Sequence, residues 1–319
     1  MKTVSHQDIF GKRILLRIDS DVPLKEGIIQ DDFRLKAGME TLLLCLENAK
    51  EITICGHLGR PEGEDHNLSI APVSEWIKNY CIKKDFPKAN LNVIENLRFE
   101  KGEDECDESF ARDLASFGEV FINESFAAHH PSASVSLVPK IMPSFAGLRF
   151  AKEVETILSI KNSDQKPKIA IIGGAKQEDK YPAILELAKI CDYILVGGLL
   201  PKEIKEENLE IPSNVILGSL NDTGFDLNED SIKKFGELVN GASQIIWAGP
   251  VGKYEVENKG NLNLAKIVLT SSAKSLIGGG DTTAALNFYL DKFSFVSTGG
   301  GAMLDLLIKG TLPSIDAIS

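Results

Sequence analysis

Three glycine-rich turns in the second half of the sequence have the composition of anion-binding loops. They are Gly173–Lys176, Gly278–Thr282 and Ser297–Gly301, and each lies between an expected strand and an expected helix. Glycine has no Cβ, so backbone N–H groups can approach an anion closely, and the helix that follows adds partial positive charge. A plain tight turn is the alternative explanation for any one of them. Three such turns in one half of the chain favour phosphate binding.

Charged residues stand beside two of these turns. Lys176 and Lys180 are four residues apart and share a helical face, from which their ammonium groups could reach a transferring phosphoryl group. Two solvated lysines are the alternative. Asp281 could hold Mg²⁺ against nucleotide phosphates, or could cap the helix that begins there. Neither the P-loop motif nor the dinucleotide-binding fingerprint occurs, so a nucleotide site must have another design.

The first half carries a different group of polar residues. They lie at or shortly after expected strands: Asp19, Asp21, Arg34, His57, Arg60 and Arg98. Parallel sheets gather such residues at the carboxyl ends of their strands. Because guanidinium groups bind phosphate and carboxylate bidentately, this group suits a phosphorylated carboxylate. Taken singly, each residue could be structural, and Arg98 could simply pair with the acidic stretch Glu103–Glu108.

Short apolar runs bounded by turn residues predict the strands that would position these side chains. The runs are Ile14–Ile18, Ile52–Cys55, Val93–Ile94, Val120–Ile122, Ile169–Ile172, Tyr193–Val196, Val215–Leu217, Ile245–Trp247, Ser275–Ile277 and Phe295–Val296. Stretches with helical spacing alternate with them: Arg34–Asn48, Ala71–Tyr80, Ser109–Ser116, Phe150–Lys161, Tyr181–Lys189 and Thr282–Leu290. This alternation predicts the α/β class, with parallel sheets and crossover helices.

Length and composition bound the class of protein. The 319 residues suffice for two domains of about 150 residues each, and we expect the linker in the polar stretch Asn162–Lys168. A net charge of -11 disfavours nonspecific binding to nucleic acid or anionic membrane. The five cysteines form no CxxC pair, and no apolar run approaches the 18 or so residues that cross a bilayer. We therefore expect a cytoplasmic protein with reduced thiols and no membrane segment.

Ordered sequence blocks along nearly the whole chain resemble phosphoglycerate kinases. In the first half they are RIDSDVP at Arg17–Pro23, DDFR at Asp31–Arg34, GHLGRP at Gly56–Pro61, ENLRF at Glu95–Phe99 and INESF at Ile122–Phe126. In the second half they are GGAKQEDK at Gly173–Lys180, WAGPVGKYE at Trp247–Glu255, IGGGDT at Ile277–Thr282 and STGGGAMLDLL at Ser297–Leu307.

The resemblance implies a fold and an activity. It implies two doubly wound α/β domains joined by a hinge, with a substrate domain at residues 1–155 and a nucleotide domain at residues 156–305. A tail at residues 306–319 would return to the first domain. The activity would be reversible transfer of phosphoryl from 1,3-bisphosphoglycerate to MgADP, giving 3-phosphoglycerate and MgATP. Such transfer depends mainly on positioning and charge neutralisation. We expect a monomer with Mg²⁺ as cofactor.

The resemblance also implies site residues. The glycerate substrate would be bound by Asp19, Asp21, Arg34, His57, Leu58, Gly59, Arg60, Arg98 and His130. The nucleotide would be bound by Gly174, Lys176, Lys180, Glu255, Gly278, Gly279, Gly280, Asp281 and Thr282, with Glu255 at the ribose and Mg²⁺ on Asp281. Arg34 and Lys176 would be catalytic, because both would neutralise the moving phosphoryl group.

Three positions and one shortened segment depart from the family pattern. Asp21 replaces an asparagine, which places a second carboxylate beside an anionic substrate and should weaken its binding. His130 or Pro131 stands where the family has a further substrate arginine. His129 and His130 could replace part of its charge when protonated, or could be exposed loop histidines. Ala248 replaces an asparagine near the adenine, and the stretch from residue 198 to residue 247 is shorter than in family members.

Two alternatives to the kinase activity follow from these departures. One is a protein of the same scaffold that binds nucleotide or another anion without turnover. The other is a kinase for a different small carboxylate or sugar phosphate.

Overall fold

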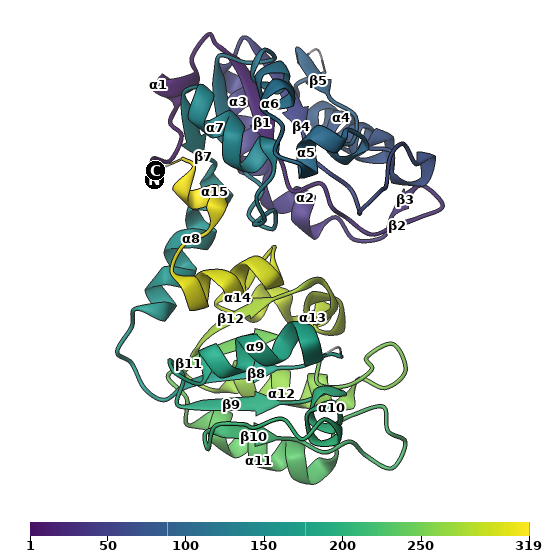
Figure 1. Cartoon of the computed structure of the whole chain (residues 1–319), viewed down its shortest axis with the longest axis vertical. Helices are drawn as coiled ribbons and strands as arrows, with labels where there is room; N and C mark the ends of the chain where they lie inside the picture. The colour runs from purple at the N-terminus through teal and green to yellow at the C-terminus, as the bar shows by residue number, and fades with distance from the viewer. Residues whose placement is uncertain (88, 176, 319) are drawn as a thin grey trace. The chain divides into compact units, whose positions relative to one another are not determined.

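The structure is a computed structural model that describes residues 1–87, 89–175 and 177–318. The chain divides into unit 1, formed by Met1–Val154 and Thr311–Ser319, and unit 2, formed by Glu155–Gly310. The chain passes between the units inside one helix, α8 (Leu148–Lys161), and returns after Gly310 (Figure 1). The expected linker at 162–168 is therefore wrong. Buried apolar residues continue at helical spacing through Val154 and Ile157, so the helix does not stop at the boundary.

Unit 1 contains a parallel sheet with the strand order β5-β4-β1-β6-β7. The strands are β1 (Arg13–Arg17), β4 (Glu51–Cys55), β5 (Leu91–Val93), β6 (Val120–Asn123) and β7 (Ser144–Ala146). Alternate residues of β1 belong to separate cores, because Ile14 and Leu16 pack with residues of α3 and α4, whereas Leu15 packs with residues of α6 and α7. The sheet is thus covered on both faces, which is why apolar residues predominate in its strands.

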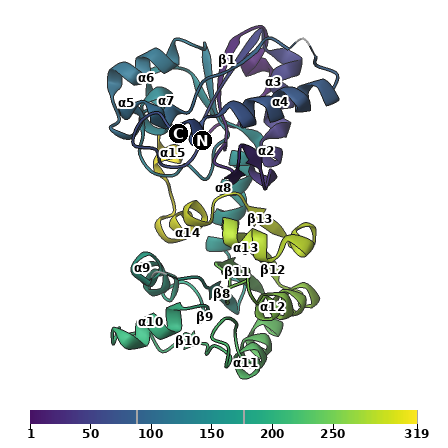
Figure 2. The same cartoon turned by 90° about the vertical axis from the view of Figure 1, so that its right-hand side faces the viewer.

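The helices of unit 1 connect these strands or flank them. They are α1 (His6–Ile9), α2 (Phe33–Ala37), α3 (Met39–Asn48), α4 (Ala71–Lys83), α5 (Lys101–Asp104), α6 (Glu108–Ala115), α7 (Val138–Ile141) and α15 (Pro313–Asp316). Two 3₁₀ helices, η1 (His66–Leu68) and η2 (Leu97–Phe99), a π-helix, η3 (Ala133–Leu137), and a hairpin of β2 (Leu24–Lys25) and β3 (Ile28–Ile29) complete the unit. Figure 2 shows α15 on this unit, near the N-terminus.

Unit 2 contains a second parallel sheet, with the strand order β10-β9-β8-β11-β12-β13. The strands are β8 (Lys168–Ile172), β9 (Tyr193–Val196), β10 (Val215–Leu217), β11 (Gln244–Ala248), β12 (Lys274–Gly278) and β13 (Phe295–Ser297). The helices are α9 (Gln177–Leu187), α10 (Leu200–Glu206), α11 (Glu229–Asn240), α12 (Lys259–Thr270), α13 (Gly280–Ala285), the 3₁₀ helix η4 (Asn287–Lys292) and α14 (Gly300–Lys309). Helices α9, α10 and α14 pack together, as do α11 and α12.

The α/β class with two doubly wound parallel sheets is confirmed. Every expected strand is present, with ends that differ by one or two residues. The expected helix Arg34–Asn48 is instead two helices that meet at Gly38, and the expected helix Thr282–Leu290 is divided between α13 and η4. The sequence did not predict β7 or the β2–β3 hairpin. No helix in the described part of the chain is long and apolar enough to cross a membrane.

Candidate functional sites

In each sheet the strand order reverses at one point, and a crevice forms there. The reversal lies between β1 and β6 in unit 1 and between β8 and β11 in unit 2. Open parallel sheets bind ligands at the carboxyl ends of the strands beside this point, because the two connections leave in opposite directions. Residues that follow these strands line a cavity in each unit.

The cavity of unit 1 has a volume of about 150 Å³ and carries most of the predicted substrate residues. Its predicted lining residues are Asp21, His57, Arg60, Arg98 and His130. Arg17, which the sequence analysis did not single out, lies at the end of β1 and lines the same cavity. A guanidinium that faces a cavity beside other cations provides a site for an anion.

His57 lies at the centre of these cations and is neutral. Its side chain is buried, and Arg17 Nη2 lies 3.3 Å from His57 Nδ1. An arginine can only donate, so Nδ1 accepts and the ring proton is on Nε2. Burial lowers the pKa of His57 well below its ordinary value, and four guanidinium groups lower it further, those of Arg17, Arg98, Arg34 and Arg60. This arrangement leaves one imidazole N–H as a donor in a strongly positive environment.

A buried ionic network holds Arg17 in place, and sequence reasoning missed it. Arg17 Nε donates to Ser134 Oγ at 2.7 Å, and Arg17 Nη2 lies 3.7 Å from Glu103 Oε1. Glu103 also accepts from the hydroxyl groups of Ser132 and Ser134, at 2.8 and 2.5 Å. The one available signal was an arginine at the end of an apolar strand, inside the block RIDSDVP. A buried charge needs such partners, because its desolvation is costly.

Arg98 and Arg34 are each held by the protein at the edge of the group. Arg98 Nη1 donates to the carbonyl oxygen of Gly59 at 2.7 Å, and Arg98 Nε pairs with Asp104 at 3.2 Å. The ion pair expected as the alternative for Arg98 therefore exists, although Arg98 also lines the cavity. Arg34 Nη1 donates to the carbonyl oxygen of Asp21 and lies 3.5 Å from Asp21 Oδ2.

The two aspartates after β1 have different surroundings. Asp21 Oδ1 accepts from the N–H of Gly59 at 3.0 Å, and its side chain is partly exposed. Asp19 is buried, and its Oδ2 accepts from the N–H of Ala127 at 3.2 Å, whereas its Oδ1 has no partner among the described residues. Burial raises the pKa of Asp19. An unused buried acceptor of this kind can receive a hydrogen bond from a substrate hydroxyl group.

The loop after β6 supplies the rim of the cavity. His129 Nδ1 lies 2.8 Å from the carbonyl oxygen of Ala127, so this nitrogen carries the proton and donates. The rings of His129 and His130 are 4.1 Å apart, and the side chain of His130 is exposed. Leu58 is buried, and its N–H donates to Asn96 Oδ1 at 3.2 Å, which fixes the backbone of the block that carries His57.

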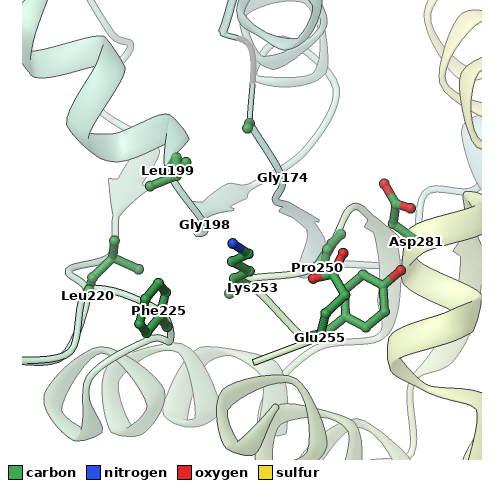
Figure 3. Close-up of a pocket in the computed structure, with 13 residues that line it drawn as sticks. Gly174, Gly198, Leu199, Leu220, Phe225, Pro250, Lys253, Glu255 and Asp281 are labelled. Carbon is green, nitrogen blue, oxygen red and sulfur yellow. The ribbon is translucent and has the colours of Figure 1, made fainter. Parts of the chain in front are cut away.

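The cavity of unit 2 has a volume of about 410 Å³ and lies at the glycine-rich turns (Figure 3). Predicted nucleotide residues Gly174, Glu255 and Asp281 line it, together with apolar residues of the two loops that follow β9 and β10. The backbones at its floor pack very closely. A Cβ built on Gly173 would lie 2.1 Å from the carbonyl oxygen of Pro250, and one on Gly198 would lie 2.5 Å from that of Gly174. Only glycine allows these strand ends to approach each other so closely.

The turn at Gly278–Gly280 leads into α13, whose N-terminus faces the same region. Gly279 has a φ of 107°, which favours glycine, and a Cβ on Gly280 would meet nothing within 4 Å. Gly278 packs against Met303. Thr282 is fully buried, where its Oγ1 donates to the carbonyl oxygen of Gly278 at 2.9 Å and accepts from the N–H of Gly249 at 2.7 Å. Its hydroxyl group is thus used within the protein.

The third glycine-rich turn packs against the second. A Cβ on Gly300 would lie 2.5 Å from the Cα of Gly279, so Gly300 must lack a side chain for the two turns to meet. Packing accounts for this turn, which does not line the cavity.

Acidic groups gather at one side of the cavity of unit 2. Glu255 and Asp281 are exposed and close enough to Tyr254 to raise its pKa, although burial of the phenol is the larger cause. No described group of three or more His, Cys, Asp or Glu residues is placed to hold a metal ion. A single carboxylate does suit Mg²⁺ that arrives on nucleotide phosphates, since Mg²⁺ takes one or two protein carboxylates in such sites. Lys180 is half-buried on α9, and Lys176 lies outside the described residues.

Comparison with known protein sequences identifies the family of the chain. The family model described as phosphoglycerate kinase matches residues 4–216 and 202–310. Phosphoglycerate kinase of Aquifex aeolicus (strain VF5) is 32% identical over 385 residues, with 98% of this chain and 97% of that protein covered. The enzyme of Hydrogenobaculum sp. (strain Y04AAS1) is 33% identical over 388 residues, with 99% and 98% covered.

Solved structures give the same result. The structure of phosphoglycerate kinase from Coxiella burnetii matches with a TM-score of 0.79 and 28% identity, over 97% of this chain and 96% of that chain. The crystal structure of phosphoglycerate kinase from Pyrococcus horikoshii OT3 has a TM-score of 0.86 at 23% identity, over 100% and 98%, and supports the fold alone. The chain therefore belongs to the phosphoglycerate kinase family.

Proposed function

We propose that unit 1 binds the glycerate substrate and that unit 2 binds the nucleotide. Membership of the family makes the chain a glycolytic kinase that transfers phosphoryl reversibly between 1,3-bisphosphoglycerate and ADP, giving 3-phosphoglycerate and ATP. No comparison favours a non-catalytic protein or a kinase for another carboxylate. The observation that carries the assignment to unit 1 is the set of four guanidinium groups around a neutral His57.

In unit 1, each substrate group would meet a suitable partner. Arg60 and Arg98 would bind the phosphate, and the Nε2–H of His57 would donate to one of its oxygens. The unpartnered Oδ1 of Asp19 would accept from the substrate hydroxyl group. Asp21 would hold Arg34 in position through the contacts between the two residues. The backbone of Leu58 and Gly59 would support the site, and His130 would complete its lining.

In unit 2, the backbone would bind most of the nucleotide phosphate charge. The N–H groups at Gly278, Gly279 and Gly280 would face the phosphates, as would Gly174 and the ammonium groups of Lys176 and Lys180. Thr282 would hold this turn against the neighbouring strand end, and Glu255 would bind the ribose hydroxyl groups. Asp281 would bind Mg²⁺, which reduces the charge of the phosphates when it is present.

Transfer itself would depend on cations that neutralise the migrating phosphoryl group. Arg34 of unit 1 and Lys176 of unit 2 are the proposed pair. The reaction needs little covalent help, because the phosphoryl group carries most of the developing charge, and positioned cations stabilise that charge.

A kinetic comparison of three proteins tests this function. Wild type, Lys176→Met and the control Lys266→Met, an exposed lysine of α12, are assayed for ATP formation from 1,3-bisphosphoglycerate and ADP. We expect Lys176→Met to lower kcat at least about a hundredfold with little change in KM, because its contact should be strongest in the transition state. Unchanged kcat would remove Lys176 from its role. Absence of ATP formation by wild type would overturn the function itself.

The remaining assignments are that the chain acts as a cytoplasmic monomer and has no nucleic acid partner. The net charge of -11 supports the assignment of no nucleic acid partner, since the phosphate backbone of a nucleic acid would be repelled.

A further inference from the structure

The cavity of unit 2 has a polar side and an apolar side. Figure 3 shows Asp281, Glu255 and Pro250 on one side, and Leu199, Leu220 and Phe225 on the other. Leu199 is 44% exposed and Phe225 is 41% exposed, although side chains of this size are ordinarily buried. A flat apolar ligand that lay against them would remove this surface from water. The apolar side therefore suits the base of the nucleotide proposed to bind here.

Lys253 projects into the cavity beside the apolar side chains (Figure 3). Its Nζ lies 5.7 Å from the centroid of the Phe225 ring. The described residues place no carboxylate in ion-pair contact with this ammonium group. An ammonium group carries three donors and no acceptor, so it can only bind an acceptor atom of a ligand.

Three backbone donors around the apolar side are already used. The N–H of Gly198 donates to the carbonyl oxygen of Val251 at 2.8 Å, and that of Leu199 to Gly174 at 3.0 Å. The N–H of Gly224 donates to Asn221 at 2.9 Å. Among the side chains on this side of the cavity, Lys253 supplies a donor that a base could reach.

The wall that carries Phe225 is fixed to the segment that carries Lys253. The N–H of Lys253 donates to the carbonyl oxygen of Phe225 at 2.6 Å. Next to it, buried Asp226 accepts from the N–H of Gly260 at 2.7 Å, at the start of α12. A Cβ on Gly252 would lie 2.4 Å from Asp226 Oδ1, so the two segments are in close contact. The backbones that carry Lys253 and Phe225 are thus held next to each other.

We propose that Lys253 donates a hydrogen bond to the nucleotide base and so favours guanine and hypoxanthine over adenine. The carbonyl oxygen of those two bases is an acceptor at the position where adenine carries an amino group, and lysine pairs well with such an edge. A donor-only site cannot satisfy that amino group, although it can still bind the ring nitrogens of adenine. This inference rests on the proposed nucleotide role of unit 2.

Titration calorimetry with ADP, GDP and IDP tests the inference. The proteins are wild type, Lys253→Met, Lys253→Arg and the matched control Lys266→Met, which removes the same charge from an exposed position of α12. Methionine keeps the apolar stem and removes the donor. We expect Lys253→Met to weaken GDP and IDP about tenfold and ADP less than about threefold. Lys253→Arg should preserve the wild-type order of the Kd values for the three nucleotides. Lys266→Met should leave all three Kd values unchanged.

The three nucleotides separate the base from the phosphates. They carry the same diphosphate, so an equal loss for all three would assign the ammonium group to the phosphates and overturn the inference. No loss for any of them would overturn it as well. If Lys253→Met does not fold, the test uses Lys253→Arg. Loss in Lys253→Arg of the wild-type preference for GDP and IDP over ADP would then overturn the inference. If wild type binds none of the three, the nucleotide role of unit 2 fails with it. If wild type binds and the ratios of Kd among ADP, GDP and IDP are the same in Lys253→Met as in wild type, the base contact alone is contradicted.

Discussion

Asp21 lies where its charge would compete with an anionic substrate for Arg34. Its Oδ2 lies 3.5 Å from Arg34 Nη1, and its Oδ1 accepts from the N–H of Gly59. Asparagine would keep the acceptor for Gly59 and would remove the negative charge beside an anionic ligand. We expect Asp21→Asn to lower the Kd of 3-phosphoglycerate about threefold to tenfold, because the repulsion between partly exposed charges is of order 1 kcal/mol. Titration calorimetry measures this change.

Asp230→Asn is the control, since it removes an exposed carboxylate of α11 and the same unit of charge. It should leave the Kd unchanged. If Asp21→Asn binds 3-phosphoglycerate more weakly than wild type, the charge of Asp21 is needed to hold Arg34, and the competition does not exist.

The sequence could predict some residues of the candidate site and not others. His57, Arg60 and Arg98 follow strands, so their gathering at one sheet edge was predictable. Arg17 was not, because an arginine in the last position of a strand is ordinarily exposed, and its distant partners Ser134 and Glu103 make its burial possible. Contacts between residues so far apart in the chain leave no periodic pattern.

At the scale of elements, Glu124 joins β6 to the helix that leaves unit 1. It follows β6 directly, and its carboxylate accepts from the N–H groups of Arg149 and Phe150, at 2.9 and 3.1 Å, in the first turn of α8. Thr41 Oγ1 donates to the same group at 2.7 Å. Burial raises the pKa of Glu124 to about 8, despite these three donors.

This pKa predicts that stability falls as pH rises. Between the ordinary value of 4.5 and about 8, folded Glu124 keeps a proton that the unfolded chain has released, so alkali favours unfolding. The contribution of protonated Glu124 to stability is complete below pH 4.5 and is lost as the pH rises through about 8. Relative to Glu124→Gln, wild type should lose about 1 kcal/mol of unfolding free energy for each pH unit in this range. Urea unfolding measures this loss in unit 1 when it is followed by the fluorescence of Trp76 in proteins that also carry Trp247→Phe.

Glu229→Gln is the control, because Glu229 is an exposed carboxylate at the start of another helix, α11. Its pH dependence should match that of wild type. Equal slopes for wild type and Glu124→Gln would show that Glu124 is ionised when folded.

Elements were predictable where local patterns determine them. The strands of both sheets are apolar runs bounded by turn residues, and the structure contains all ten that were expected. The break at Gly38 was not predictable, since a Cβ there would lie 3.1 Å from Glu124 Cγ, a residue of another element. Strand β7 was missed because it has only three residues, lies at the sheet edge and contains no apolar run that would mark it in the sequence.

At the scale of the whole molecule, the chain crosses between its units twice. The first crossing lies within α8 and the second follows Gly310, whose φ of 80° ends α14 in a left-handed cap. Lys161 Nζ donates to the carbonyl oxygens of Leu307 and Ile308, which ties the ends of α8 and α14 together within unit 2. The residues after Gly310 belong to unit 1, so the last part of the chain stabilises the first.

Deletion of Thr311 onward should therefore destabilise unit 1 and leave unit 2 nearly unchanged. Leu312, Ile315 and Ile318 are 1%, 9% and 7% exposed, and removing each costs about 2 kcal/mol, so unit 1 should lose about 4 to 6 kcal/mol. One tryptophan lies in each unit, so urea unfolding of Trp247→Phe reports unit 1 and that of Trp76→Phe reports unit 2. Ile315→Ala should give a smaller loss in unit 1 alone. A truncated chain whose Trp247 signal shifts as far as its Trp76 signal would mean that the two units unfold together.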